Sequence, residues 1–181
     1  MKNCFVLYVI ALLITVPLFT NAQPLPADTL KTQLIKDWER AKAYTALFLQ
    51  AMPADKYDWE PAKGVRSFAK QMLHLTYLNI GFGSNCTGQP RNFFNIDLSV
   101  PIEETLSSKK DSVVFYTMAG YDFVINGLKA MNAKTLLDRG KANELRISWL
   151  NKAFEHQTHH RGQCVLYLRL LGIEPPHELL F

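Results

Sequence analysis

Two histidines one helical turn apart are the residues of this chain best suited to chemistry. His156 and His160 lie in the segment 156–163, which reads HQTHHRGQ. On a helix, residues four positions apart share one face and are separated by about one turn. Two neutral imidazoles placed in this way can bind a single transition metal. The spacing therefore predicts a metal site.

The same segment argues against a zinc protease. In the HExxH signature the residue after the first histidine is a glutamate, which acts as general base. Gln157 occupies that position here and cannot accept a proton from water. The sequence identifies no other base, because nothing in it places Glu39, Asp122 or Glu155 beside the histidines. The catalytic residues therefore stay unassigned.

His74 is the best third ligand. It is the only histidine between the N-terminal apolar segment and the last predicted helix, and it lies among leucines at positions 73, 75 and 78. A buried imidazole needs partners for its ring nitrogens, and a shared metal supplies one. His159 lies about 60° from the line through His156 and His160 at 100° per residue, so we expect it to face solvent or a neighbouring polar group.

The residues that follow His160 have weaker assignments. Gln163 could hydrogen-bond a ligand imidazole, since metal-bound histidines usually have such a partner. For Arg161 we favour an ion pair with a carboxylate such as Glu155 over contact with a substrate. Cys164 is interpreted as a small buried residue, with metal ligation as the less favoured alternative. Three imidazoles suit zinc, nickel or iron and disfavour magnesium or calcium, and zinc is the default on availability.

Four helical segments must position these residues. The apolar spacing and the capping residues predict helices over 28–52, 67–82, 107–131 and 143–171, with Asp28, Ser67, Ser107 or Ser108, and Asn143 near their starts. The last helix should end at Gly172, before Pro175 and Pro176. Residues 83–107 form a long irregular segment, which we expect to be functional or to lie over a site. With no strand-like alternation, the fold class is all-α, a four-helix bundle.

The N-terminus is predicted to be a cleaved signal peptide, residues 1–22. A basic start precedes the apolar stretch 4–19, and small residues lead to Ala22. A membrane anchor is less favoured, because the stretch is short for a bilayer span and contains Pro17. The domain would then be residues 23–181, exported to the periplasm or secreted. An oxidising compartment permits a disulfide between Cys86 and Cys164, but two cysteines do not establish one.

Composition supports one globular domain. The chain has 181 residues, 48% of them hydrophobic and 20% charged, with a formal net charge of +4. Its lysines and arginines are scattered rather than clustered, so we expect no nucleic-acid partner. We also expect no stable membrane span after the leader.

Several segments together resemble the DinB-like family, also called DinB/YfiT-like. They are the HxxxHRGQ segment at 156–163, the stretch from Ser67 to His74, the DWEP sequence at 58–61 and the helix ending at 167–176. The resemblance covers nearly all of residues 23–181. It implies a four-helix bundle in which His74, His156 and His160 bind a divalent metal. Members are often dimeric, so it also implies a homodimer.

The resemblance leaves the reaction open, because the family includes hydrolases and thiol-dependent S-transferases and isomerases. We expect an exported metal-dependent hydrolase that acts on a small molecule, whose identity the sequence does not give. Export counts against a thiol transferase, since small thiols are mainly cytoplasmic. The other class is a non-catalytic metal-binding bundle. A coordination position open to water would favour the enzyme, and a fourth protein ligand would favour the structural role.

Overall fold

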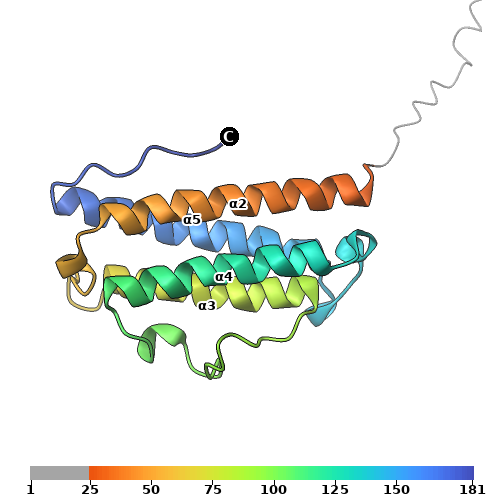
Figure 1. Ribbon diagram of the computed structural model, residues 1–181, viewed down its shortest axis with the longest axis horizontal. Helices are drawn as coiled ribbons and strands as arrows, with labels where there is room; N and C mark the ends of the chain where they lie inside the picture. The colour runs from red at the N-terminus through yellow and green to blue at the C-terminus, as the bar shows by residue number, and fades with distance from the viewer. Residues whose placement is uncertain (1–24) are drawn as a thin grey trace, which may run out of the picture.

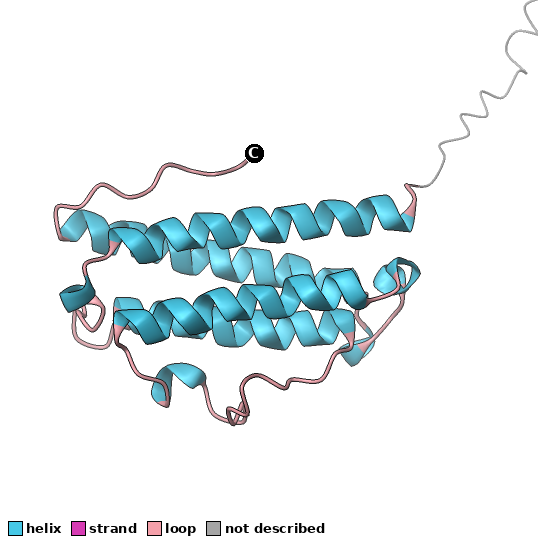
Figure 2. Ribbon diagram, viewed as in Figure 1, coloured by secondary structure: helices cyan, strands magenta, loops and turns pink. Residues whose placement is uncertain are grey.

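Four α-helices make up the structure, a computed structural model that describes residues 25–181 (Figures 1 and 2). The helices are α2 (Ala27–Ala51), α3 (Phe68–Thr87), α4 (Lys110–Ala130) and α5 (Arg146–Leu170). Short 3-10 helices lie between them: η1 (Ala54–Lys56), η2 (Ile102–Glu104), η3 (Ala133–Leu137) and η4 (Lys141–Asn143). Residues 25–181 contain no β-strand, and the predicted all-α four-helix bundle is confirmed. The predicted signal peptide, residues 1–22, lies outside the described part of the chain.

The connection between α3 and α4 sets the topology. Residues 88–109 run back along the outside of the bundle, so that α3 and α4 point in the same direction (Figure 1). α3 packs against both α4 and α5, and α2 packs mainly against α4. Parallel neighbours need a long crossover, whereas antiparallel neighbours need only a short loop. This requirement explains the long irregular segment that the sequence predicted here.

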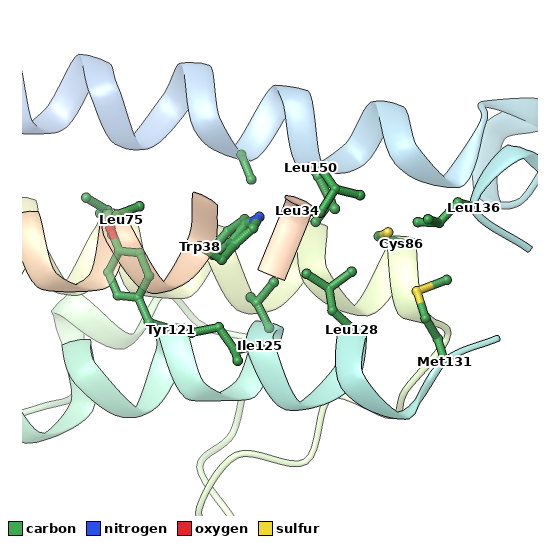
Figure 3. Packing of buried hydrophobic residues seen from close by; sticks show 13 residues of the cluster. Leu34, Trp38, Leu75, Cys86, Tyr121, Ile125, Leu128, Met131, Leu136 and Leu150 are labelled. Atoms are coloured by element: carbon green, nitrogen blue, oxygen red, sulfur yellow. The ribbon is translucent and has the colours of Figure 1, made fainter. Parts of the chain in front are cut away.

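The core consists of two hydrophobic clusters along the bundle. Figure 3 shows the first, in which Trp38 of α2 and Tyr121 of α4 are fully buried beside leucines from α3 and α5. The second surrounds Phe48, Phe68 and Ile102. Since Ile102 belongs to η2, the crossover is anchored in the core through its 3-10 helix. That anchor fixes the position of its neighbour, Glu103.

Some helix ends lie where the sequence predicted them, and others do not. The Ser67 hydroxyl caps α3 by accepting from the backbone N–H of Lys70 at 3.3 Å, as predicted. Gly172 follows α5 with a φ of 73°, the left-handed conformation expected after a helix. The expected break at Gly83 is wrong, because α3 continues to Thr87 and ends at Gly88, whose φ is 78°.

The other three helices begin a few residues away from their predicted starts. Asp28 lies in the first turn of α2 rather than at its cap, where its charge still opposes the positive end of the helix dipole. α4 begins at Lys110, after Ser107 and Ser108, and α5 begins at Arg146 rather than at Asn143. No helix among residues 25–181 is long and apolar enough to cross a bilayer.

Candidate metal centre

His74 from α3 and His156 and His160 from α5 meet where these two helices pack together. One ring nitrogen from each histidine lies within 4.8 Å of the others. The ring centroids of His74 are 5.2 Å from His156 and 4.9 Å from His160. His160 is buried, while His74 and His156 are half-buried. The three residues that the sequence selected as ligands therefore form one cluster, two of whose rings are partly accessible to solvent.

A glutamate from the crossover fixes the orientation of His74. Oε1 of Glu103 lies 2.5 Å from Nδ1 of His74, and Nη2 of Arg66 lies 3.9 Å from the same oxygen. A carboxylate oxygen only accepts, so Nδ1 carries a proton, and in the neutral form of the ring the lone pair lies on Nε2. Burial by itself would raise the pKa of Glu103. Hydrogen bonds from His74 and the backbone, with the charges of His74 and Arg66, outweigh burial and lower it.

A glutamine on α3 does the same for His160. Oε1 of Gln71 lies 2.5 Å from Nδ1 of His160, and its amide nitrogen donates to the Tyr167 hydroxyl at 3.0 Å and to Gln163. These donations leave Oε1 as the acceptor, so Nδ1 of His160 is the donor. The lone pair of His160 is then on Nε2, which lies 3.0 Å from Nε2 of His156.

Burial keeps the two α5 histidines neutral. It is the main cause that lowers the pKa of His156 to about 4 and the pKa of His160 to about 3. Positive charge on the neighbouring histidines and on Arg66 lowers both further. A metal binds the neutral imidazole, so the ligand form is already present at neutral pH.

The donor atoms fit a divalent transition metal. A tetrahedral ion about 2.0–2.1 Å from each nitrogen would hold the nitrogens roughly 3.3 Å apart. The observed Nε2 separation of 3.0 Å between His156 and His160 is close to that value. Nδ1 of His156 and Oε2 of Glu103 are buried without a protein partner. Imidazole donors suit zinc, nickel or iron rather than magnesium or calcium.

The other residues that the sequence placed near the site lie elsewhere. His159 is exposed, and its ring nitrogen pairs with the Gln163 amide at 2.8 Å. Gln163 contacts Gln71 rather than a ligand imidazole, so the structure gives Gln71 the role that the sequence suggested for Gln163. Arg161 points away from the histidines, toward α2 and α4. Its hydrogen bonds go to neutral groups, so the expected ion pair with Glu155 is wrong.

Residues 25–181 contain two cysteines, and neither takes part in the histidine cluster. Cys164 is buried in the second core cluster and Cys86 in the first, and both are free. Burial raises the pKa of each thiol, to about 12 for Cys86. The interpretation of Cys164 as a small buried residue agrees with this position.

The acidic residues considered as bases are not part of the histidine cluster. Glu39 pairs with Lys129 and Asp122 with Lys42, at 2.9 and 2.6 Å, and Glu155 is exposed on α5.

Gln71 and Glu103 are the site residues that sequence reasoning missed. A signal existed for Gln71, which precedes His74 by three positions and so lies near it on the helix. None existed for Glu103, because its position depends on the path of the crossover.

Comparisons with known proteins find similarity to the DinB family and to solved structures of DinB-like proteins. The DinB family model matches residues 145–178, which contain α5 and the start of the tail. A DinB-like protein from Bacillus cereus ATCC 10987 superimposes with a TM-score of 0.65 and 16% identity, over 80% of this chain and 95% of that one. The DinB-like protein YjoA from Bacillus subtilis gives 0.62 and 17%, over 82% and 96%. No curated protein matches the chain significantly.

Proposed function

We propose that this DinB-like four-helix bundle binds one divalent transition metal through His74, His156 and His160, and that it is an exported metal-dependent hydrolase of a small molecule. One observation carries the metal site. Nδ1 of His74 and Nδ1 of His160 are both hydrogen-bonded to acceptors, so that their Nε2 lone pairs are available within one 4.8 Å cluster. Rings held in this way are typical of metal-binding histidines.

The residues of the chain would hold the ion and the rings around it. Glu103 orients His74, and the negative charge of its carboxylate partly balances a dication. Gln71 orients His160 without adding charge. When bound, such an ion supplies Lewis acidity, which can activate water or polarise a substrate carbonyl.

The ligand count supports an enzyme over a purely structural site. Among residues 25–181, the metal-ligand cluster contains three residues, and Cys164 and the acidic residues of the helices lie outside it. Three protein ligands leave a position for water or substrate, as in catalytic zinc sites. The half-exposed rings of His74 and His156 give that position a route to solvent. Zinc is the proposed ion, with nickel or iron as the alternatives.

Metal content tests the proposal. Protein purified without chelators or nickel columns is expected to contain about one transition metal per chain by elemental mass spectrometry. His156→Ala is expected to lose the metal, because two imidazoles bind far more weakly than three. His159→Ala removes a histidine from the same helix without touching the cluster's donor atoms, and its metal content should equal the wild type.

Activity then separates the two functional classes. A hydrolase should cleave one member of a panel of small esters, amides and lactones, lose that activity in His156→Ala and keep it in His159→Ala. A wild type that stays metal-free after reconstitution would contradict the metal site. A metal-loaded protein that cleaves none of the panel would favour the non-catalytic bundle.

A further inference from the structure

Arg161 is a buried charge whose partners are all neutral. The residue is 7% exposed. Its Nη1 donates to Oε1 of Gln157 at 3.0 Å and to the hydroxyls of Thr45 and Tyr121 at 3.2 and 3.4 Å. Its Nη2 donates to the Thr158 hydroxyl at 3.4 Å. A guanidinium stays charged in a protein, so this side chain brings a full positive charge into the bundle.

No carboxylate neutralises that charge. Among the ion pairs of residues 25–181, none includes Arg161. Its Nε is buried without a partner, and the ring of Tyr44 lies 5.1 Å from the guanidinium carbon. Buried charges are ordinarily paired, because leaving water is costly for an ion. The anion that would pair with Arg161 is therefore missing from the chain's own contacts.

A cavity lies against Arg161. It has a volume of about 240 Å³ and is bounded by α2, α5 and the C-terminal tail. Arg161, Arg40 and Tyr44 form its polar wall, and Phe48, Phe154 and Val165 form its apolar wall. At roughly 30 Å³ per water molecule, the space corresponds to about eight waters. A ligand of that size would have a charged end and a short apolar body.

We propose that this cavity binds a small organic monocarboxylate, with its carboxylate at Arg161 and its apolar part against Phe48, Phe154 and Val165. Arginine forms paired hydrogen bonds with carboxylates, which suits a planar anion better than a spherical one. The cavity is separate from the histidine cluster, since none of the three histidines lines it. His160 contacts Gln71 on α3, whereas Arg161, about 100° further around α5, contacts Thr45 on α2 and Tyr121 on α4. The proposal does not depend on the metal.

The C-terminal tail forms the outer wall of the site. Nη1 of Arg40 donates to the backbone oxygen of Leu179 at 2.7 Å, which fastens the tail beside α2 (Figure 1). Glu178 and Leu180 line the same cavity. The Glu178 carboxylate is exposed and forms no ion pair with Arg40 or Arg161 in the described structure. It would repel an incoming carboxylate, so Glu178 should weaken binding.

Titration calorimetry with hexanoate tests the proposal. Hexanoate has a carboxylate, a short apolar chain and eight non-hydrogen atoms. We expect one molecule per chain, with a Kd of about 1 mM or tighter, and no heat from hexanamide, its neutral analogue. Inorganic phosphate at the same ionic strength should bind at least about tenfold more weakly, because it cannot use the apolar wall.

Variants locate the binding. Gly162 lines the cavity, and a Cβ added there would meet no atom within 4 Å. Gly162→Leu should therefore fold normally while its side chain fills the cavity, and hexanoate binding should fall at least tenfold. Glu178→Gln should bind about two- to fivefold more tightly, as expected for removing one exposed like charge. Arg161→Met should abolish binding, with its fold checked by circular dichroism.

Two results would overturn the proposal. One is a wild-type protein that gives no hexanoate heat, or binds phosphate as well as hexanoate. The other is a folded Gly162→Leu protein that binds hexanoate as the wild type does. Neither result bears on the metal content of the histidine cluster, which is measured separately.

Discussion

Each histidine of the cluster has two nitrogens, and the hydrogen bond at one decides what the other can do. Gln71 and Glu103 each accept from an Nδ1 and leave Nε2 as the donor atom for a metal. They differ in charge: Glu103 adds a negative charge next to His74, whereas Gln71 only selects the tautomer of His160. Removing Gln71 therefore tests the contribution of ring orientation without changing the charge beside the cluster.

Gln71→Leu should weaken zinc binding by about 10- to 100-fold, the usual cost of losing such a partner. The leucine has nearly the same volume but cannot accept from Nδ1, so His160 can adopt the tautomer that points a proton at the metal position. Zinc affinity is measured by competition with a fluorescent chelator. Gln33→Leu makes the same change on the exposed surface of α2 and should leave the affinity within about twofold. Equal affinities in both variants would show that Gln71 does not orient the ligand.

At the level of the helices, two glycines let α3 and α4 approach closely. A Cβ on Gly120 of α4 would lie 2.5 Å from Cγ2 of Thr76, and one on Gly83 of α3 would lie 2.7 Å from Cγ2 of Val124. Each glycine thus accepts a β-branched side chain from the facing helix. This close contact also explains why Gly83 continues the helix instead of ending it.

Gly120→Ala should destabilise the protein, whereas Gly162→Ala should stabilise it. An alanine in a helix gains about 1 kcal/mol over glycine from backbone entropy. At position 162 the new methyl group meets open space, so that gain should appear nearly in full. At position 120 it meets Thr76, and overpacking costs about 1–3 kcal/mol. Urea unfolding should show a difference of about 1–3 kcal/mol between the two variants. A more stable Gly120→Ala protein would mean that α3 and α4 can move apart freely.

At the level of the whole molecule, the histidines link stability to pH. His156 and His160 have folded pKa values of about 4 and 3, below the ordinary 6.5, chiefly because of burial. When the pH falls below 6.5, the unfolded chain binds protons that the folded chain does not. The stability that depends on neutral histidines is therefore complete above pH 6.5 and is lost as the pH falls toward 4.

The free energy of unfolding of the metal-free protein should fall between pH 7.5 and 5 by on the order of 1–3 kcal/mol. This range lies above the ordinary pKa of glutamate, so the lowered pKa of Glu103 contributes little within it. A double variant, His156→Ala with His160→Leu, should lose most of the slope. Urea unfolding at a series of pH values gives the comparison, and an unchanged slope in the double variant would place the titration elsewhere.

The sequence predicted what local patterns can specify. The i, i+4 spacing of His156 and His160 identified a shared helix face, and the apolar surroundings of His74 singled it out as the third member of the cluster, although its ring is half-buried rather than buried. Ser67 and Gly172 marked helix ends because their capping conformations depend on few neighbours. These features could be predicted because each depends only on residues within one or two helical turns.

The rest depends on contacts between distant segments. From the sequence alone, Gly83 predicts the end of a helix. In the fold it lies inside α3, where the absence of a side chain makes room for Val124 of α4. Nothing in the sequence distinguishes Glu103 from the other acidic residues. Its contact with His74 arises only from the path of the crossover between α3 and α4. The stretch 164–171 is apolar nearly all round, which by itself would predict burial on every side. Leu166 and Leu170 are nevertheless 60% and 67% exposed, because α5 packs mainly against α3 and the neighbouring helices cover only part of its surface.

The order in which the histidines are synthesised has a consequence for metal supply. His74 emerges early, but α4 and the crossover separate it from His156 and His160 on the last helix. An ion that requires all three ligands can be held firmly only after α5 has docked against α3. In cells, metal availability largely decides which ion fills a site of imidazole ligands. Any ion bound at this cluster should therefore reflect the compartment where the finished chain folds, rather than the place where its synthesis begins.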